Sequence, residues 1–142
     1  MSEDRPLDAD EFERWRLEAD HALKAAAPLG ESGPFNWACF LLEQAAQLAV
    51  KALLHGTGAA PWGHDLEVLG RRLADAGIDV PVPVSDALAR LGRHYIPARY
   101  PDAHALGPAA SHYRRSDADE ASGDAKVILR FVDNVWKDLS GT

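Results

Sequence analysis

The chain has 142 residues, of which 46% are hydrophobic, and a formal net charge of −7. The length and apolar content predict one folded domain over residues 1–142, with a core from about 10 to 139, and exclude a disordered chain. The negative charge argues against a general nucleic-acid coat protein. The single cysteine, Cys39, excludes an internal disulfide and a multi-cysteine metal cage.

The segment 1–6 (Met-Ser-Glu-Asp-Arg-Pro) is acidic and polar, unlike the basic and apolar start of a signal peptide. No window approaches 18 uninterrupted apolar residues, which a membrane-spanning helix would need. We therefore expect a cytoplasmic protein without a membrane span.

Two helices are predicted in the first part of the chain. From about 10 to 27, apolar residues recur at three- and four-residue spacing, Asp8 or Asp10 can cap the helix, and Pro28 ends it. The second helix, about 35 to 55, is apolar on most sides, which is typical of a helix in the middle of a bundle. Its polar residues lie four apart and form one stripe: Glu43, Gln47 and Lys51.

Two shorter elements follow. A third helix is predicted from about 64 to 76, and Gly77 ends it. Residues 80–84 are expected to be extended because two prolines disfavour helix at the residues before them. Ser85 is then predicted to cap a short helix that ends near His94.

The last part of the chain combines an irregular segment with a long helix. Prolines and a glycine interrupt residues 96–115, and Ser116, with Asp119, is predicted to cap the final helix. Its apolar residues form a seam that needs a partner helix. Without strand-like alternation, the prediction is an all-α fold, an antiparallel up-and-down bundle of four long helices and one short one. Leu48, Leu53, Ile128 and Val135 are assigned to the core, and Trp15 and Trp136 partly to a homodimer interface.

Charge is distributed unevenly along the chain. Between residues 87 and 116 there are five arginines and one acid, Asp102, so this segment carries +4 and the remainder of the chain carries −11. Such a segment can bind an anion on an acidic protein. The alternative is that its arginines pair with the acidic helices around them.

Three stretches carry a family resemblance. They are Phe40-Leu-Leu-Glu-Gln-Ala-Ala-Gln-Leu-Ala-Val-Lys-Ala-Leu-Leu54, then His64-Asp-Leu66, then Tyr95-Ile-Pro-Ala-Arg-Tyr-Pro-Asp102 followed by Tyr113. Over roughly residues 10 to 137 this pattern resembles the HEPN family in its bacterial and archaeal form. The resemblance implies a helical bundle that often forms homodimers. It also implies one of two activities: a metal-independent ribonuclease with an Arg-x(4–6)-His motif shared across a dimer, or a partner of a small nucleotidyltransferase, often in a toxin–antitoxin pair.

Arg99 and His104 have this arginine–histidine spacing and are the candidate catalytic pair. A histidine can take a proton from a ribose 2′-hydroxyl or return one to the leaving oxygen, and an arginine can hold the phosphate. Arg16 and His21 have the same spacing inside the first helix, so position alone favours Arg99 and His104.

The chain also departs from the family's nuclease pattern. Tyr100 and Pro101 follow the arginine, where the family commonly has a polar residue on a helix. Leu106 stands two residues past the histidine, where some family nucleases carry a tyrosine that the partner enzyme modifies. Tyr113 is the nearest later tyrosine and a weak candidate for that modification.

The remaining site residues follow from their position near the motif, and each has a structural alternative. Arg99 and Asp102 could anchor the loop through a salt bridge or through hydrogen bonds at a helix end, and the tyrosines could be packing residues. His64, next to Asp65, could be a helix N-terminal residue rather than a ligand, and the polar stripe of the second helix could face solvent. His94 and His112 lack metal-ligand spacing, so we expect no metal and no cofactor. The candidate ligand-binding residues are Arg99, Tyr100, Asp102, Tyr95, Glu43, Lys51 and His64.

Three functions remain open from the sequence. The first is a HEPN module that binds nucleotide or RNA phosphate and works with a nucleotidyltransferase in a toxin–antitoxin-type pair. The second is a metal-independent endoribonuclease that uses Arg99 and His104. The third is a structural dimerisation module without a ligand.

Overall fold

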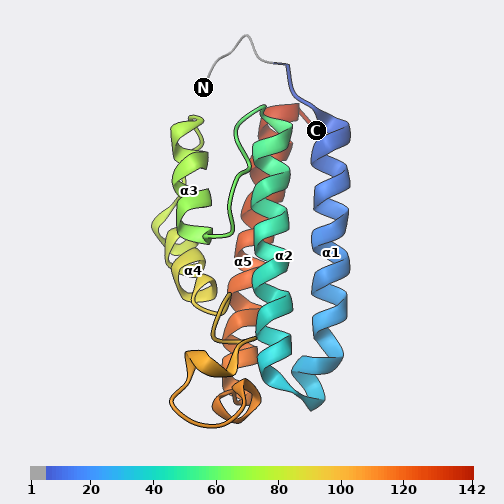
Figure 1. Ribbon diagram of the computed structural model, residues 1–142. Helices are drawn as coiled ribbons and strands as arrows, with labels where there is room; N and C mark the ends of the chain where they lie inside the picture. Colours follow the sequence, from blue (N-terminus) through green and yellow to red (C-terminus); the bar gives the residue numbers. More distant parts are fainter. Residues whose placement is uncertain (1–5) are drawn as a thin grey trace.

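The sequence folds into five α-helices in the computed structural model, which describes residues 6–142 (Figure 1). Most of the acidic segment 1–6, whose composition argues against a signal peptide, lies outside the described residues. No strand occurs within the described part, so the predicted all-α class is confirmed. The helices are α1 (Ala9–Ser32), α2 (Phe35–Gly56), α3 (Leu66–Asp75), α4 (Val82–Gly92) and α5 (Arg115–Ser140), with short 3-10 turns at Pro101–Ala103 and Ala109–His112.

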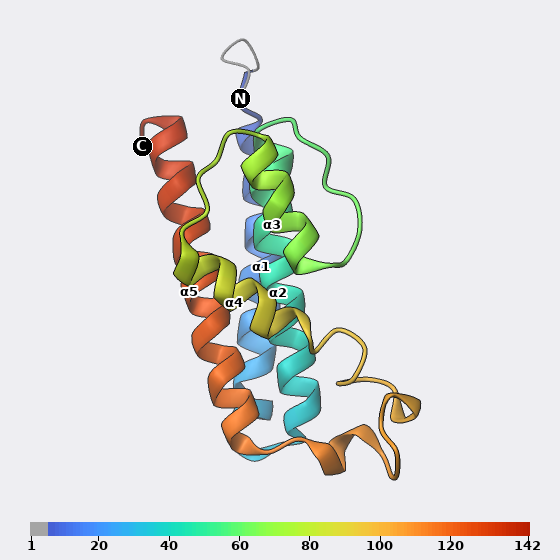
Figure 2. The same ribbon diagram turned by 90° about the vertical axis from the view of Figure 1, so that its left-hand side faces the viewer.

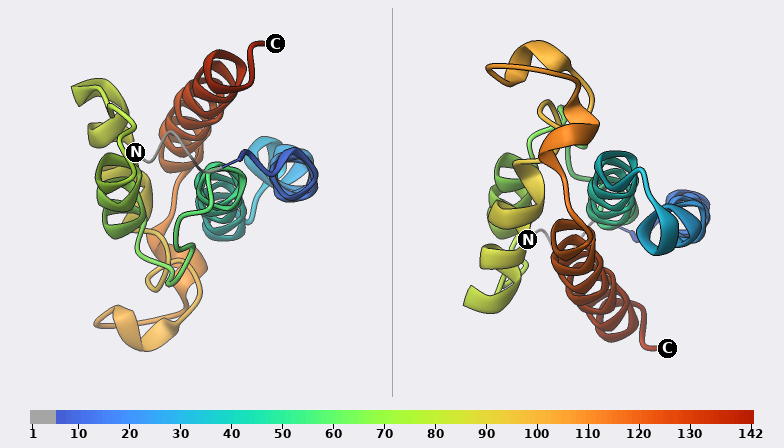
Figure 3. Two further views of the ribbon diagram at one scale, coloured as in Figure 1. Left: turned by 90° about the horizontal axis from the view of Figure 1, so that it is seen from above. Right: turned by 90° about the horizontal axis from the view of Figure 1, so that it is seen from below.

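Helix α2 is the centre of the bundle, as its apolar composition predicts. It packs against α1, α3, α4 and α5, and Figure 3 shows it between α1 on one side and α3 and α4 on the other, with α5 alongside. Small side chains on α2 let its neighbours approach closely. Those with no exposed surface are Ala38, Ala45, Ala46, Ala49 and Ala52.

By length and composition, α2 could also cross a membrane. However, 67% of its most apolar window is buried inside the bundle. Burial on several sides is typical of the core helix of a water-soluble bundle.

The long helices do not simply alternate in direction. The backbone N–H of Asp8 donates to Gly56 O at 2.9 Å, and the Phe12 ring stacks on Trp136 with centroids 4.1 Å apart. Helix α1 therefore runs antiparallel to both α2 and α5. Helices α2 and α5 therefore run in the same direction. Helices α3 and α4, which lie between them in the chain, cover one side of the bundle (Figure 2).

Three helix ends differ from the sequence prediction. Helix α1 continues through Pro28 to Ser32, with Asp8 as its cap. Helix α4 begins at Val82, so residues 80–84 are not all extended and Ser85 lies inside the helix. Proline is tolerated in a first helical turn, where its missing N–H has no partner to lose.

Helix α5 begins two residues earlier than predicted. Arg114, not Ser116, is its N-cap residue, and its backbone N–H donates to Asp117 Oδ2 at 2.8 Å. Three of the five helices are long, and α3 and α4 have 10 and 11 residues. The prediction of four long helices and one short one overestimated α3, because the loop before it extends to Asp65, which caps it.

The predicted core residues separate into two groups. Leu53 and Ile128 have no exposed surface, whereas Leu48 and Val135 are half-buried against the core. The indole of Trp15 stacks on His55, and that of Trp136 stacks on Phe12, so both rings already pack within the chain. Cys39 is a buried free thiol whose pKa burial raises to about 12, which makes it unreactive at neutral pH.

Gly56 lies where α1, α2 and α5 meet. A Cβ atom on this residue would lie 2.6 Å from Cζ3 of Trp136 and 3.0 Å from Cβ of Phe12. We expect Gly56→Ala to lower the free energy of unfolding by about 1–3 kcal/mol, because the stacked rings must move. Urea unfolding measures this. Gly123→Ala in α5 is the control, since a Cβ there meets nothing within 4 Å, and a Gly56→Ala protein as stable as wild type would contradict the packing described.

Candidate functional site

The segment between α4 and α5 carries most of the candidate site residues. It is irregular, as its prolines predict, and includes the two 3-10 turns. It extends from one end of the bundle (Figure 2). Asn36 of α2 anchors it, because its buried Nδ2 donates to Ala98 O at 2.9 Å. This bond holds the next residue, Arg99, against α2.

Arg99 is surrounded by aromatic rings. Its guanidinium carbon lies 4.7 Å from the ring centroid of Phe40, 4.3 Å from that of Tyr95 and 4.9 Å from that of Tyr100. Its Nε–H donates to Tyr95 O at 2.8 Å. Ring faces attract a guanidinium and fix its plane, so the group is oriented without an acidic partner. We call Arg99, Phe40, Tyr95 and Tyr100 the Arg99 cluster.

Of the two structural alternatives for Arg99, the salt bridge with Asp102 is not formed. The single hydrogen bond of the Arg99 side chain within the described residues goes to the Tyr95 carbonyl, and Asp102 is exposed in a 3-10 turn. The reason is geometric: Arg99 turns back toward α2, whereas Pro101 starts a new turn that leads Asp102 away.

A buried carboxyl group lies beneath this cluster. Glu43 has no exposed surface and accepts hydrogen bonds from Gln47 Nε2 at 2.7 Å and Gln44 Nε2 at 2.9 Å. Burial raises the pKa of Glu43 to about 7, and the two amides, Arg99 and Lys51 oppose the rise. Near neutral pH, Glu43 is therefore only partly ionised, which limits how far it can neutralise Arg99.

The polar stripe of α2 turns inward rather than to solvent. Gln47 is buried like Glu43, and its Oε1 lies 3.3 Å from Nδ1 of His64. The imidazole of His64 stacks on Tyr95 with centroids 5.3 Å apart. Lys51 is half-buried, and burial lowers its pKa. The stripe thus connects α2 with the start of α3 and with the Arg99 cluster.

His104 belongs to a second group of rings. It stacks on His112 with centroids 4.2 Å apart, and its ring is edge-on to Tyr113 at 6.4 Å. Buried His94 completes this His104 cluster, with Nδ1 2.9 Å from the Tyr113 hydroxyl. Burial lowers the pKa of His94 to about 4 and raises that of Tyr113 to about 12, so both are neutral near pH 7.

The hydrogen bonds of His104 define which nitrogen could transfer a proton. Its Nε2 lies 2.7 Å from Pro97 O, and Nε2 of His112 lies 2.5 Å from Leu106 O. Because a carbonyl oxygen only accepts, both Nε2 atoms carry hydrogen. In neutral His104, Nδ1 is then the basic nitrogen.

The structure therefore places the two motif residues in adjacent but separate clusters. Arg99 contacts rings of α2 and its own turn, whereas His104 contacts His112, Tyr113 and Pro97. Two hollows flank Pro97 on the surface. One, of about 350 Å³, is lined by His94, His104, His112 and Tyr113, and the other, of about 390 Å³, by His64, Tyr95 and Ile96; both include Arg93 and Pro97.

Part of the positive charge of this segment is neutralised internally. Arg90 pairs with Asp124 at 2.9 Å and Arg93 with Glu120 at 2.6 Å, both acids of α5. Arg115 donates instead to the carbonyls of Gly30 and Glu31. The alternative in which the arginines pair with acidic helices thus describes Arg90 and Arg93 but not Arg99 or Arg115.

Sequence reasoning missed three contributors to these clusters. Phe40 was part of the quoted helix motif, but nothing in the spacing indicated that it lies against Arg99. His94 and His112 were considered only as metal ligands. Within residues 6–142, no group of three or more His, Cys, Asp or Glu side chains is arranged to hold a metal ion. The proximity of three histidines in the basic segment was the signal available for a ring cluster.

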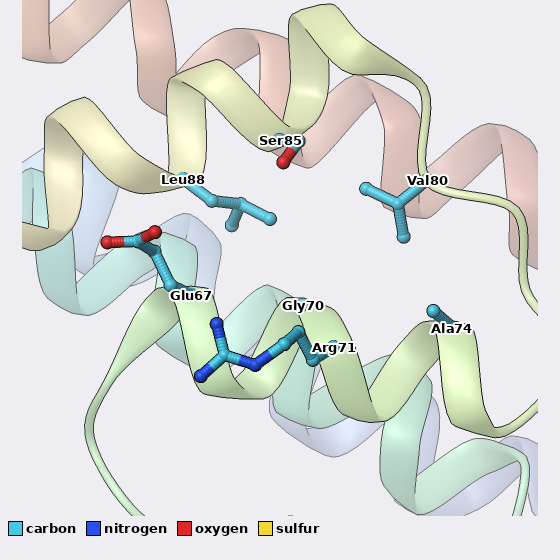
Figure 4. Close-up of a pocket in the computed structure, with 7 residues that line it drawn as sticks. All are labelled: Glu67, Gly70, Arg71, Ala74, Val80, Ser85 and Leu88. Atoms are coloured by element: carbon cyan, nitrogen blue, oxygen red, sulfur yellow. The ribbon is translucent and has the colours of Figure 1, made fainter.

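A further pocket lies away from these residues, between α3 and α4 (Figure 4). Its volume of about 220 Å³ is below the usual range for small-molecule sites. It is lined by Glu67, Gly70, Arg71, Ala74, Val80, Ser85 and Leu88, none of which is a predicted site residue.

Comparisons with known proteins identify the family of the chain and support its fold. The model of the HEPN domain matches residues 12–135. A crystal structure of the protein TT1696 from Thermus thermophilus is 42% identical, with a TM-score of 0.81 over 87% of this chain and 96% of that one. An archaeal HEPN homologue is 32% identical, with a TM-score of 0.73 over 87% and 95%. A HEPN domain protein from Thermotoga maritima is 27% identical, with a TM-score of 0.71 over 87% and 98%. The comparison with curated proteins gives no match.

Proposed function

Because the chain belongs to the HEPN domain family, we propose that it binds the phosphate of a nucleotide or of RNA at Arg99. The proposal rests on the contacts that the Arg99 guanidinium makes and on the ion pair that it lacks. Three rings orient it and Tyr95 O accepts from Nε, while no carboxylate of the described residues forms an ion pair with it. The two terminal nitrogens are therefore available for the bidentate contact that phosphate favours.

The charges and the hollow near Arg99 also support phosphate binding. Of the five arginines in the +4 segment, Arg90 and Arg93 are paired with acids of α5, whereas Arg99 is not. Its buried acidic neighbour Glu43 is held partly neutral near pH 7. The hollow beside Tyr95, of about 390 Å³, is in the size range of ligand pockets. Tyr95 lines this hollow and contacts Arg99, and His64, which stacks on Tyr95, lines it together with Asp65 and Arg93.

Removal of Arg99 tests the proposal. Arg99→Ala is expected to weaken binding of a short labelled RNA by about 1–3 kcal/mol, because a charge-assisted contact is lost. Fluorescence anisotropy measures the affinity. Arg130→Ala is the matched control, since Arg130 is an exposed arginine of α5 and its loss changes the net charge equally. Equal affinities of the Arg99 and Arg130 variants would assign Arg99 a structural role and favour a dimerisation module without a ligand.

A metal-independent endoribonuclease is the second candidate function. The observation that favours it is the His104 ring, which two aromatic neighbours and the Pro97 carbonyl hold in one tautomer, with Nδ1 as its base. A fixed, half-buried imidazole can transfer a proton from a ribose hydroxyl. In this alternative Arg99 would hold the phosphate, and the two clusters would act on one substrate or across a dimer.

Membership of the HEPN family also suggests which proteins this chain binds. We propose a homodimer, and a nucleotidyltransferase as a partner in a toxin–antitoxin-type pair, because these are the assemblies that the HEPN family implies. Tyr113 stays a weak candidate for modification, since its hydroxyl is half-buried and lies 2.9 Å from His94 Nδ1. A modifying enzyme would have to break that contact.

A further inference from the structure

Two exposed aromatic side chains lie at the Arg99 cluster: Tyr100 belongs to it, and Trp37 lies next to it. Trp37 is 43% exposed and Tyr100 is 46% exposed. Tyr100 contacts the Arg99 guanidinium directly, and Trp37 reaches it through Phe40, whose ring is 6.0 Å away and nearly perpendicular to the indole. Trp37, Phe40, Arg99 and Tyr100 are therefore linked by successive contacts, and we call these four residues the aromatic row.

Helix α2 holds the aromatic row in place. Phe40 lies one helical turn after Trp37 on α2, and Asn36 pins the turn that carries Arg99 and Tyr100 through its bond to Ala98 O. The backbone at both ends of the aromatic row is thus fixed before a ligand binds. Preorganised rings lose little conformational freedom on binding, which favours affinity.

The row leaves aromatic faces exposed to water. A perpendicular contact with Phe40 leaves at least one face of the Trp37 indole uncovered, and the contact between Arg99 and Tyr100 occupies at most one face of the phenol ring. Exposed π-faces next to an unpaired guanidinium match a ligand that has flat rings and a negative charge at regular spacing. Unpaired nucleotides have this chemistry, because their bases can stack on aromatic side chains while their phosphates reach arginine.

We infer that Trp37 and Tyr100 form a base-stacking platform for unpaired nucleotides of single-stranded RNA, beside the phosphate site at Arg99. The inference rests on the proposed phosphate binding at Arg99 and adds the form of the ligand. Bases in a duplex are covered on both faces by their neighbours, so a duplex can offer its phosphates to Arg99 but not its bases to the platform.

The test compares three ligands of equal length: a single-stranded RNA, the same strand in a duplex, and an abasic oligomer that keeps the phosphates. Wild type is expected to bind the single strand most tightly. Trp37→Ala should weaken that binding by roughly 5- to 100-fold and leave the abasic oligomer unaffected. Tyr100→Ala also removes one of the rings that orient Arg99, so it should weaken binding of the single strand more than binding of the abasic oligomer. Tyr100→Phe should bind as wild type does, because the ring is retained. Trp62→Ala is the matched control, since Trp62 is 70% exposed and lies outside the aromatic row.

The outcomes separate the platform from the phosphate site. If wild type binds the single strand and the abasic oligomer equally, while Arg99→Ala weakens both, the platform is overturned and the phosphate site stands. If Trp62→Ala weakens binding as much as Trp37→Ala and Tyr100→Ala do, the platform is also overturned. If wild type binds none of the three ligands, the proposed function fails and the platform fails with it. Circular dichroism of each variant establishes that it is folded.

Discussion

In a Glu43→Gln protein, the free energy of unfolding is expected to rise steeply with pH between about 4 and 6.5, whereas wild type stays nearly flat. Two buried groups with opposite shifts cause the difference. Burial raises the pKa of Glu43 from 4.5 to about 7, so the stability that its proton contributes is present below pH 4.5 and lost as the pH rises through 7. Burial lowers the pKa of His94 from 6.5 to about 4, so stability is lost as the pH falls from 6.5 to 4.

In wild type these two effects oppose each other between pH 4.5 and 6.5. Each amounts to at most about 1.4 kcal/mol per pH unit, so removing Glu43 leaves the contribution of His94 uncompensated. His94→Gln should give the reverse slope, with stability falling as the pH rises. Urea unfolding of the three proteins across this range measures the slopes. Parallel curves for wild type and Glu43→Gln would mean that the Glu43 carboxyl is not buried as described.

His104→Gln gives the other large expected effect, and it separates a nuclease from a binding module. Glutamine keeps a donor that can reach Pro97 O but cannot transfer a proton near neutral pH. In the ribonuclease alternative, the variant therefore keeps RNA affinity and loses cleavage by a factor on the order of 10²–10⁴. Cleavage by wild type would survive chelators and leave 2′,3′-cyclic phosphate ends, which gel electrophoresis and end analysis detect.

The binding proposal makes a different prediction for the same proteins. Wild type and His104→Gln bind RNA equally, and both leave it intact at high protein concentration. His21→Gln is the matched control, because His21 is exposed on α1 and has the same spacing from an arginine, Arg16, but lies outside both ring clusters. Cleavage that survives in His104→Gln would exclude His104 as the general base.

The bundle could be predicted from the sequence because its helices carry strong local patterns. The apolar run of α2 and the seam of α5 predicted the elements that form the core, and α2 lies at the centre as expected. Proline was less informative: Pro28 was predicted to end a helix that continues past it, and Pro83 lies inside the first turn of α4. At Pro28, packing of the helix outweighs the loss of one backbone hydrogen bond, whereas Pro83 in a first turn has no such bond to lose.

The candidate site could be predicted only as a set of residues, not as an arrangement. Spacing placed Arg99 and His104 on the same loop, yet a loop turns within a few residues, and here each side chain joins a different ring cluster. The inward orientation of Glu43 and Gln47 also depends on where α3 and the loop pack. Such contacts between distant segments leave no periodic pattern in the sequence.

The central claim, a phosphate contact at Arg99, is tested most directly by the salt dependence of RNA binding. The logarithm of the association constant, plotted against the logarithm of the salt concentration between about 50 and 200 mM, has a slope that reports the number of phosphates neutralised. For Arg99→Ala we predict a slope shallower than that of wild type by about 0.7, the value expected for one lost contact to a single strand. Arg130→Ala should keep the slope of wild type. Identical slopes for wild type and Arg99→Ala would contradict the phosphate site.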